Sequence, residues 1–198
     1  MKEKLADFYK IPWGGAIETN SDVLTYAKKE DLKGFNEIRF YTGERIGDWP
    51  SGITFYVRGE QEADYIVLGL HWAVVSEKVR QVFKQCEVKD VQFLPINVIH
   101  IESGKQFGPY WVLHVLKVAD AVNWEKTTWV TSAAPRDIYP VFGIRKIVLN
   151  ARELKDIEIF RVGKNAKAHT WVFISRKLKE CLIDSGVKGF KFTPIDSD

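Results

Sequence analysis

The chain has 198 residues, of which 45% are hydrophobic and 28% are charged, and this composition excludes a disordered protein. A chain of this length buries roughly 70% of its unfolded surface, so its core needs no metal or disulfide. The net charge is +3, and residues 136–198 alone carry +5. We interpret this basic third as a solvated face. A surface for an acidic partner is the alternative.

The cysteines, the N-terminus and the longest apolar stretch indicate the cellular compartment of the protein. Cys86 and Cys181 lie in apolar patterns of helical spacing, so we interpret them as free thiols that act as small buried hydrophobes in a reducing compartment. The polar N-terminus contains no secretory signal, and the longest apolar stretch, residues 65–75, is too short to span a bilayer. The sequence therefore predicts a cytoplasmic protein without a membrane partner.

Residues 1–60 are the least regular part of the chain. Glycine-rich and proline-containing loops surround two short segments of strand-forming residues, 37–41 and 53–57. We predict one strand at each of these segments and irregular structure elsewhere in this part.

An internal repeat organises the rest of the chain. Residues 71–96 align without a gap with residues 170–195, at a spacing of 99, and eight of the 26 aligned positions are identical. We interpret this match as a duplication. The identical pairs are Trp72/Trp171, Ser76/Ser175, Lys78/Lys177, Val88/Val187, Lys89/Lys188, Phe93/Phe192, Pro95/Pro194 and Ile96/Ile195.

Each copy predicts a strand, a helix and a closing strand. Short apolar runs precede Ser76 and Ser175, which stand where the N-cap of a helix belongs. Gly186 suits the left-handed residue that ends the second helix, and Glu87 takes that place in the first. A proline follows in each closing strand, so we expect that strand to end, bulge or lie at a sheet edge near it.

Strand signals dominate the sequence between the two copies. Residues 97–102 and 110–118 predict a hairpin around a loop at 103–108. Residues 144–149 and 157–162 predict further strands, joined by a short helical turn at most, and 163–168 predicts a turn. The whole chain, 1–198, is therefore expected to form a single α+β body with a mixed or antiparallel sheet.

No motif of catalysis, metal binding or nucleotide binding is present. The four histidines show no metal-ligand spacing, and no glycine-rich phosphate loop occurs, so we expect no cofactor. His100 and His114 lie on opposite arms of the predicted hairpin, where a two-histidine metal site is a minor alternative. An enzyme site assembled from dispersed carboxylates and histidines also stays open, because such groups meet only in the folded chain.

The order of these segments resembles a known family. The repeated strand–helix–strand unit, the stretch 115–124, and the strands at 144–149 and 159–162 are together similar to the immunity-protein domain of bacterial polymorphic toxin systems, once catalogued as a domain of unknown function. The resemblance covers about residues 64–195. It implies a small, non-catalytic cytosolic antidote that binds a cognate toxin protein and covers or distorts its active site.

A binder of this kind needs anchoring side chains, and large aromatic residues are typical anchors. Four tryptophans outside the repeated core are candidate toxin contacts: Trp13, Trp49, Trp124 and Trp129. The alternative interpretation is that they hold loops against the core. A nucleic-acid-binding domain is the remaining functional alternative, which the sparse basic residues of the C-terminal third do not favour. Those residues include Arg145, Lys146, Arg161, Lys164, Lys167, Arg176, Lys177 and Lys179.

Overall fold

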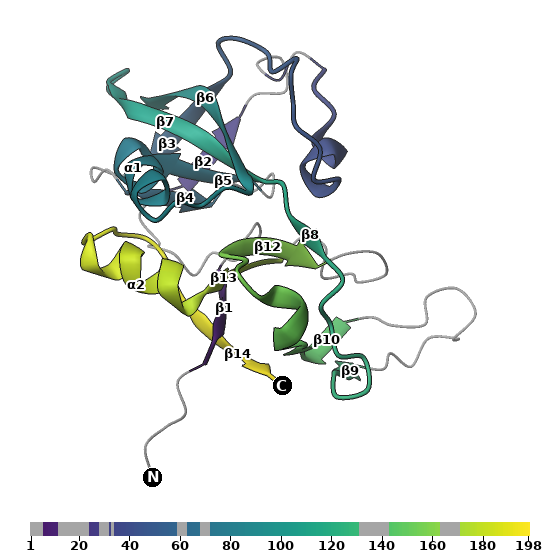
Figure 1. Cartoon of the computed structure of the whole chain (residues 1–198). Coiled ribbons are helices and arrows are strands. Elements are labelled where there is room, and N and C mark those ends of the chain that lie inside the picture. Colours follow the sequence, from purple (N-terminus) through teal and green to yellow (C-terminus); the bar gives the residue numbers. More distant parts are fainter. Residues whose placement is uncertain are drawn as a thin grey trace.

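The fold was determined as a computed structural model, which describes residues 6–11, 24–27, 32, 34–58, 63–67, 72–130, 143–162 and 171–198. Figure 1 shows one sheet with helix α1 above a second sheet with helix α2, and both helices lie at the same end of the seam between the sheets. Both sheets contain parallel and antiparallel pairs. The predicted α+β class with mixed sheets is confirmed.

The first sheet has the strand order β2-β3-β6-β7-β5-β4. Its β6–β7 pair is the predicted hairpin, with a loop that is shorter than expected because 106–108 already belong to β7. Only the β3–β6 pair is parallel. The strands are β2 (Leu24–Ala27), β3 (Thr54–Arg58), β4 (Tyr65–Val67), β5 (Ala73–Ser76), β6 (Val91–His100) and β7 (Gln106–Val115).

The second sheet has the order β11-β14-β1-β13-β12-β8, and β9 pairs with β10 beside it. The N-terminal strand β1 runs between β13 and β14, although its partners are more than 160 residues away in the chain. The strands are β1 (Phe8–Ile11), β8 (Val118–Ala119), β9 (Thr128–Val130), β10 (Gly143–Lys146), β11 (Val148–Leu149), β12 (Ile159–Val162), β13 (Val172–Ser175) and β14 (Thr193–Ser197).

Two predictions for residues 1–60 are wrong. Strands β1 and β2 lie where irregular structure was predicted, because they pair with distant strands β13, β14 and β3. The strand predicted at 37–41 does not form. Residues Glu37–Tyr41 form the 3-10 helix η2, because the side chain of Asn36 accepts a hydrogen bond from the Ile38 N–H and so stabilises a turn. Ile38 is then 66% exposed while Phe40 is buried. The strand expected at 53–57 is confirmed as β3, and the short helical turn expected between β11 and β12 is η3 (Ala151–Leu154).

The helices begin and end as the sequence predicts, with one difference. They are α1 (Glu77–Gln85) and α2 (Arg176–Asp184), with Ser76 and Ser175 as their N-caps. The Ser175 hydroxyl accepts from Leu178 N (3.1 Å). Ser76 makes no such cap with its side chain, and its hydroxyl donates to Asp64 Oδ1 (2.7 Å). Beyond the helices, Glu87 and Gly186 adopt left-handed backbone angles (φ 55° and 63°), as predicted.

The strand pairing follows the same spacing as the helices. In the first sheet Trp111 pairs with Val75 on one side and Pro95 on the other. In the second sheet Tyr9 pairs with Ile174 and Pro194, which lie 99 residues beyond Val75 and Pro95. Strand β1 therefore occupies in the second sheet the place that β7 occupies in the first.

The correspondence extends upstream of the sequence match, with a spacing of 94. Thr54 of β3 pairs in parallel with Asn97, and Val148 of β11 pairs in parallel with Asp196. In the same way β4 beside β5 corresponds to β12 beside β13. We call β3–β7 with α1 the first unit, and β11–β14 with α2 and β1 the second unit.

Alternate residues of the strands build three apolar layers. Ala73, Val75, Val172 and Ile174 point into the cluster between the two sheets, which the buried faces of both helices share. The residues between them, Val74 and Phe173, join the clusters on the outer faces of the first and second sheets.

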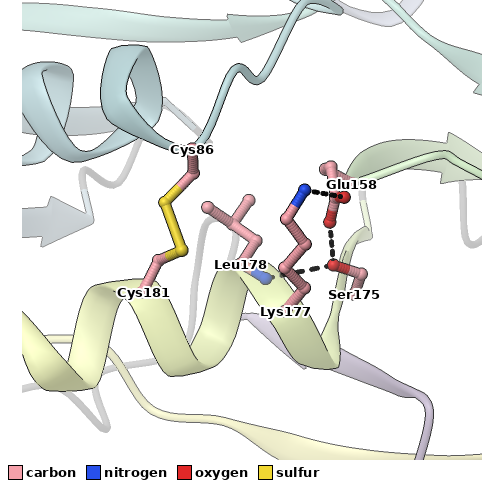
Figure 2. The surroundings of a disulfide bond; sticks show 6 residues. All are labelled: Cys86, Glu158, Ser175, Lys177, Leu178 and Cys181. Carbon is pink, nitrogen blue, oxygen red and sulfur yellow. Dashed lines mark hydrogen bonds and ion pairs between the residues drawn. A yellow bond between two sulfur atoms is a disulfide. The ribbon is translucent and has the colours of Figure 1, made fainter.

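The expectation of two free thiols is wrong. Cys86, at the end of α1, and Cys181, within α2, form a disulfide between the two helices, with 6.9 Å between their Cα atoms (Figure 2). The repeat does not reveal this bond, because the positions 99 residues from the cysteines hold Ser185 and Val82. It depends on how the helices pack side by side at the seam.

Candidate functional site

The predicted tryptophan contacts have different surroundings. Trp49 is half-buried, its Nε1–H donates to the carbonyl of Pro95 (2.9 Å), and its ring lies 5.0 Å from that of Phe35 and 5.8 Å from that of Trp72. This packing matches the alternative interpretation, in which the ring holds a loop against the core. Trp13 and the side chain of Trp129 lie outside the described residues. Trp124 is 39% exposed.

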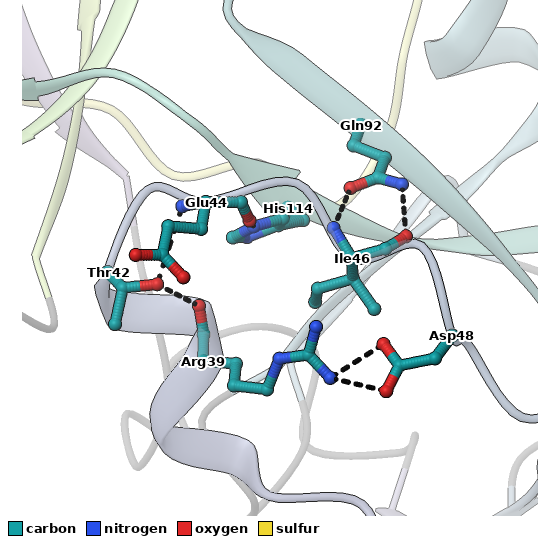
Figure 3. A network of polar contacts seen from close by, with 7 residues as sticks. All are labelled: Arg39, Thr42, Glu44, Ile46, Asp48, Gln92 and His114. Atoms are coloured by element: carbon teal, nitrogen blue, oxygen red, sulfur yellow. Dashed lines mark hydrogen bonds and ion pairs between the residues drawn. The ribbon is translucent and has the colours of Figure 1, made fainter.

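The loop that carries Trp49 is held on the outer face of the first sheet by polar contacts (Figure 3). Arg39 donates two hydrogen bonds to Asp48 (2.7 and 2.9 Å), and these lower the pKa of the Asp48 carboxyl. The Gln92 side chain bonds both backbone groups of Ile46 (2.9 and 2.8 Å). These contacts hold the loop against the sheet.

A further tie joins the loop to the sheet through a buried histidine. The Nε2–H of His114 donates to the carbonyl of Glu44 (2.7 Å), and the imidazole packs 5.2 Å from the ring of Phe40. Burial lowers the pKa of His114, so the ring is neutral near pH 7.

The exposed Trp124 belongs to a turn that is fastened to the C-terminal strand. Its neighbours Asn123 and Lys126 both donate to Asp198 Oδ2, each at 2.6 Å. The Lys126 contact is the main cause of the lowered pKa of the Asp198 carboxyl. This turn lies beside an open groove, because Lys126 and Asp198 also line that groove.

We call this depression the β14 groove. It has a volume of about 830 Å³. Tyr9 of β1, Pro194 of β14 and Phe192 supply aromatic and apolar lining, and Tyr9 is 5% exposed. Its charged side chains are Asp7, Lys126, Lys146, Lys179, Asp196 and Asp198.

The β14 groove has as many lysines as carboxylates, and two of the lysines form ion pairs within it. Lys126 bonds Asp198 and Lys146 bonds Asp196, both at 2.6 Å, while the Lys179 ammonium lies 3.9 Å from the centre of the Tyr9 ring. An apolar centre inside a polar, solvated rim is the usual anatomy of a protein–protein interface. The arrangement can bind and orient another polypeptide.

The first unit contains a related groove. Arg80, Trp111 and Pro95 correspond in position to Lys179, Tyr9 and Pro194, and the Arg80 guanidinium lies 4.8 Å from the Trp111 ring. A cavity of about 450 Å³ opens beside Arg80, lined by Phe83 and Phe93. The two units thus repeat a cation over an aromatic ring, but the second groove is larger and carries more charge.

The described part of the chain does not support a metal site. His114 pairs with Gln92 at one end of the β6–β7 hairpin and His100 lies at the other end, so the hairpin does not bring the two histidines together. Within the described ranges, no three His, Cys, Asp or Glu side chains are placed to hold a metal ion.

The described basic residues of the C-terminal third do not form one stripe. Arg161 is buried, while Lys146, Arg176 and Lys177 form ion pairs with carboxylates of the same chain. Lys164 and Lys167 lie outside the described residues. A nucleic-acid surface is therefore not supported by the part of the chain that is described.

No helix among the described residues is long and apolar enough to cross a membrane.

Comparisons with known proteins identify the family. No curated protein matches the sequence. A family model described as Immunity protein family (Imm11) matches residues 16–197, a longer range than the 64–195 of the resemblance. The chain belongs to the Imm11 immunity protein family.

Proposed function

We propose that this protein neutralises a cognate toxin protein by binding it, without catalysis, as part of a bacterial polymorphic toxin system. The observation that carries the proposal is the match of the Imm11 family model to residues 16–197. The site is compatible with it, because a binder needs a stable scaffold and anchoring side chains rather than a reactive constellation.

The β14 groove with Trp124 is the surface we propose for the toxin. Its aromatic lining supplies apolar area, and its exposed lysine–carboxylate pairs can exchange partners with charges on the toxin. The balanced charge favours a toxin surface of mixed charge over a strongly basic one. Trp13, Trp49 and Trp129 stay predictions as toxin contacts.

We also propose that the two units descend from a duplication. The shared spacing of helices and strand partners supports this origin, as do the identical serine–lysine pairs, Ser76 with Lys78 and Ser175 with Lys177. Each pair contacts an acidic side chain at the corresponding place, Asp64 in the first unit and Glu158 in the second.

A cytoplasmic location also stays a proposal, and one observation speaks against it. Disulfides are rare in cytosolic proteins, and Cys86 and Cys181 form one here. Alkylation of the cysteines in intact cells, followed by mass spectrometry, decides between bonded and free thiols in the native compartment.

Rescue of a poisoned host tests the function. The toxin encoded beside this chain is expressed in a host cell with and without it, and purified toxin is titrated with the chain. We expect restored growth and a stable complex with a dissociation constant in the nanomolar range. Growth that stays arrested, with no complex, would contradict the proposal.

The same assay tests the groove. Trp124→Ala combined with Lys179→Glu removes one exposed ring and reverses one charge, so we expect the dissociation constant to rise by tenfold or more. Arg80→Glu, at the corresponding position of the first unit, is the matched control and should leave binding unchanged. Lys179→Glu alone is compared with Arg80→Glu, and equal effects of these two charge reversals would contradict the β14 groove as the toxin surface.

A further inference from the structure

The seam between the two units has two corresponding halves, and in one of them a loop is seated. The loop after α2 lies on the first unit, where Lys188 N donates to Asp64 Oδ2 (2.9 Å) and Lys78 Nζ donates to the carbonyl of Gly186 (2.6 Å). The fit is close, because a Cβ on Gly189 would lie 2.7 Å from the backbone carbonyl oxygen of Tyr65. A carboxylate and an ammonium here hold the peptide groups of another segment.

The other half of the seam contains the same parts. Glu158 corresponds to Asp64, since the carboxylate of each accepts a hydrogen bond from the hydroxyl of the N-cap serine. The backbone carbonyl of each also accepts from the backbone N–H of that serine, at 2.9 Å for Glu158 and 3.0 Å for Asp64. Lys177 stands for Lys78 at the spacing of 99. The loop that corresponds to 186–189 is 87–90, after α1.

This second half is open. Loop 87–90 faces Glu158 and Lys177 across a cavity of about 220 Å³ that also touches Cys86 and Asp156. Lys177 Nζ turns back to Glu158 Oε1 at 3.2 Å (Figure 2). In the first half, Lys78 Nζ lies 4.0 Å from Asp64 and bonds a peptide carbonyl instead. The pair that holds a loop in the first half thus faces an open cavity in the second.

The charges of the open half differ from those of the filled half. Glu87 and Asp90 replace Gly186 and Gly189, and with Asp156 and Glu158 they give the cavity four carboxylates against two lysines. The described residues offer no group of three ligands for a metal ion, which disfavours a cation alone. The excess negative charge, in a chain of net charge +3, favours a basic side chain.

We propose that this open half of the seam is a second docking site, which takes a loop of the partner protein that carries a basic side chain. The basic side chain lies against Glu87, Asp90 and Asp156. The peptide groups of the loop bond Glu158 and Lys177, as those of 186–188 bond Asp64 and Lys78. The identity of the partner as the toxin rests on the proposed function, but the cavity and its ligand class do not.

A titration with a small probe tests the cavity by itself. N-acetyl-arginine amide offers a guanidinium and two peptide groups, and N-acetyl-glutamine amide is the uncharged control. We expect saturable shifts of the backbone amide NMR signals of residues 87–90 and 156–159 of the full chain, with the arginine probe only. Shifts that do not saturate, or that spread over the whole acidic surface, would overturn the proposal.

Variants make the test specific. Asp90→Asn with Asp156→Asn keeps the shapes of the side chains, and asparagine tolerates the left-handed backbone of Asp156 (φ 61°), so the fold should persist. Binding of the arginine probe should weaken about tenfold or more. Glu180→Gln, on the exposed face of α2, is the control and should not change it. An unchanged affinity in the double variant would exclude the cavity as the site.

The identified toxin completes the experiment. Its dissociation constant should rise about tenfold or more with the double variant, at an unchanged melting temperature. If the toxin binds both proteins equally, the second docking site is wrong and the proposed function stands. If the toxin binds neither, the proposed function fails, and the probe titration still decides whether the cavity takes a basic peptide.

Discussion

At the scale of single residues, polar side chains away from the open surface connect the parts of this chain. The buried His114 and the partly buried pair Asp64 and Glu158 are the clearest cases. The sequence predicted both N-cap serines but missed their acidic partners, because the spacing between the units changes from 99 to 94 across loops of unequal length. A gapless alignment cannot show a partner that lies on the other side of an insertion.

His114 should make stability depend on pH. Its pKa is lowered by burial, so the unfolded chain takes up a proton near pH 6.5 that the folded chain does not. The contribution of neutral His114 to the free energy of unfolding should therefore be complete above that pH. Below it, the free energy of unfolding should fall by at most about 1.4 kcal/mol per pH unit for one proton. Urea unfolding at several pH values measures it. His114→Gln, which keeps a donor for Glu44, should flatten the dependence, and an unchanged slope would refute the assignment.

Asp64 should contribute more to the free energy of unfolding than an exposed ion pair does. It accepts from the Ser76 hydroxyl and from Lys188 N, so Asp64→Ala leaves two donors without an acceptor, at a cost of about 2–3 kcal/mol in the free energy of unfolding. Asp48→Ala, which removes the exposed contact with Arg39, is the matched control and should have a smaller effect. Chemical denaturation compares them. Equal losses would mean that the filled half of the seam does not contribute to stability.

At the scale of elements, a helix or strand could be predicted where its own residues carry a clear pattern. The helices, the β6–β7 hairpin and most strands of the repeat have strong local patterns, and they form where expected. The closing strand of the second copy differs, because β14 begins at Thr193 and leaves Phe190 and Phe192 outside it. Strand β1 has four residues and gains its place only from partners at the far end of the chain. The strand predicted at 37–41 is wrong because the Asn36 side chain accepts a hydrogen bond from Ile38 N–H, which stabilises a turn instead. The wrong prediction for the cysteines has the same cause, since helix packing brings them together.

The disulfide should stabilise the pair of helices. It joins cysteines 95 residues apart, and closing a loop of that length stabilises the fold by about 4–5 kcal/mol in the chain-entropy model. We expect Cys86→Ala with Cys181→Ala to lower the free energy of unfolding by a large part of this amount. Oxidised wild-type protein treated with a reductant should converge on the variant. A reductant without effect would show that the two thiols are not bonded in solution.

At the scale of the whole molecule, two units enclose a common interior and leave surfaces for another polypeptide. The class of fold and the immunity family could be predicted from the order of the strand and helix segments, because the sequence marks these segments locally and repeats them in the two units. The surfaces could not. The β14 groove combines β1, residues near 126 and the C-terminal strand, and the seam cavity depends on which half of the seam a loop fills.

The stoichiometry of neutralisation tests the central claim most directly. A fixed amount of the cognate toxin is titrated with this chain while the activity of the toxin is followed. Because a binder is consumed by its target, we predict a linear loss of activity that ends at one equivalent. Inactivation by a small fraction of an equivalent would reveal an enzyme, and full activity in the presence of excess chain would show that the toxin is not bound.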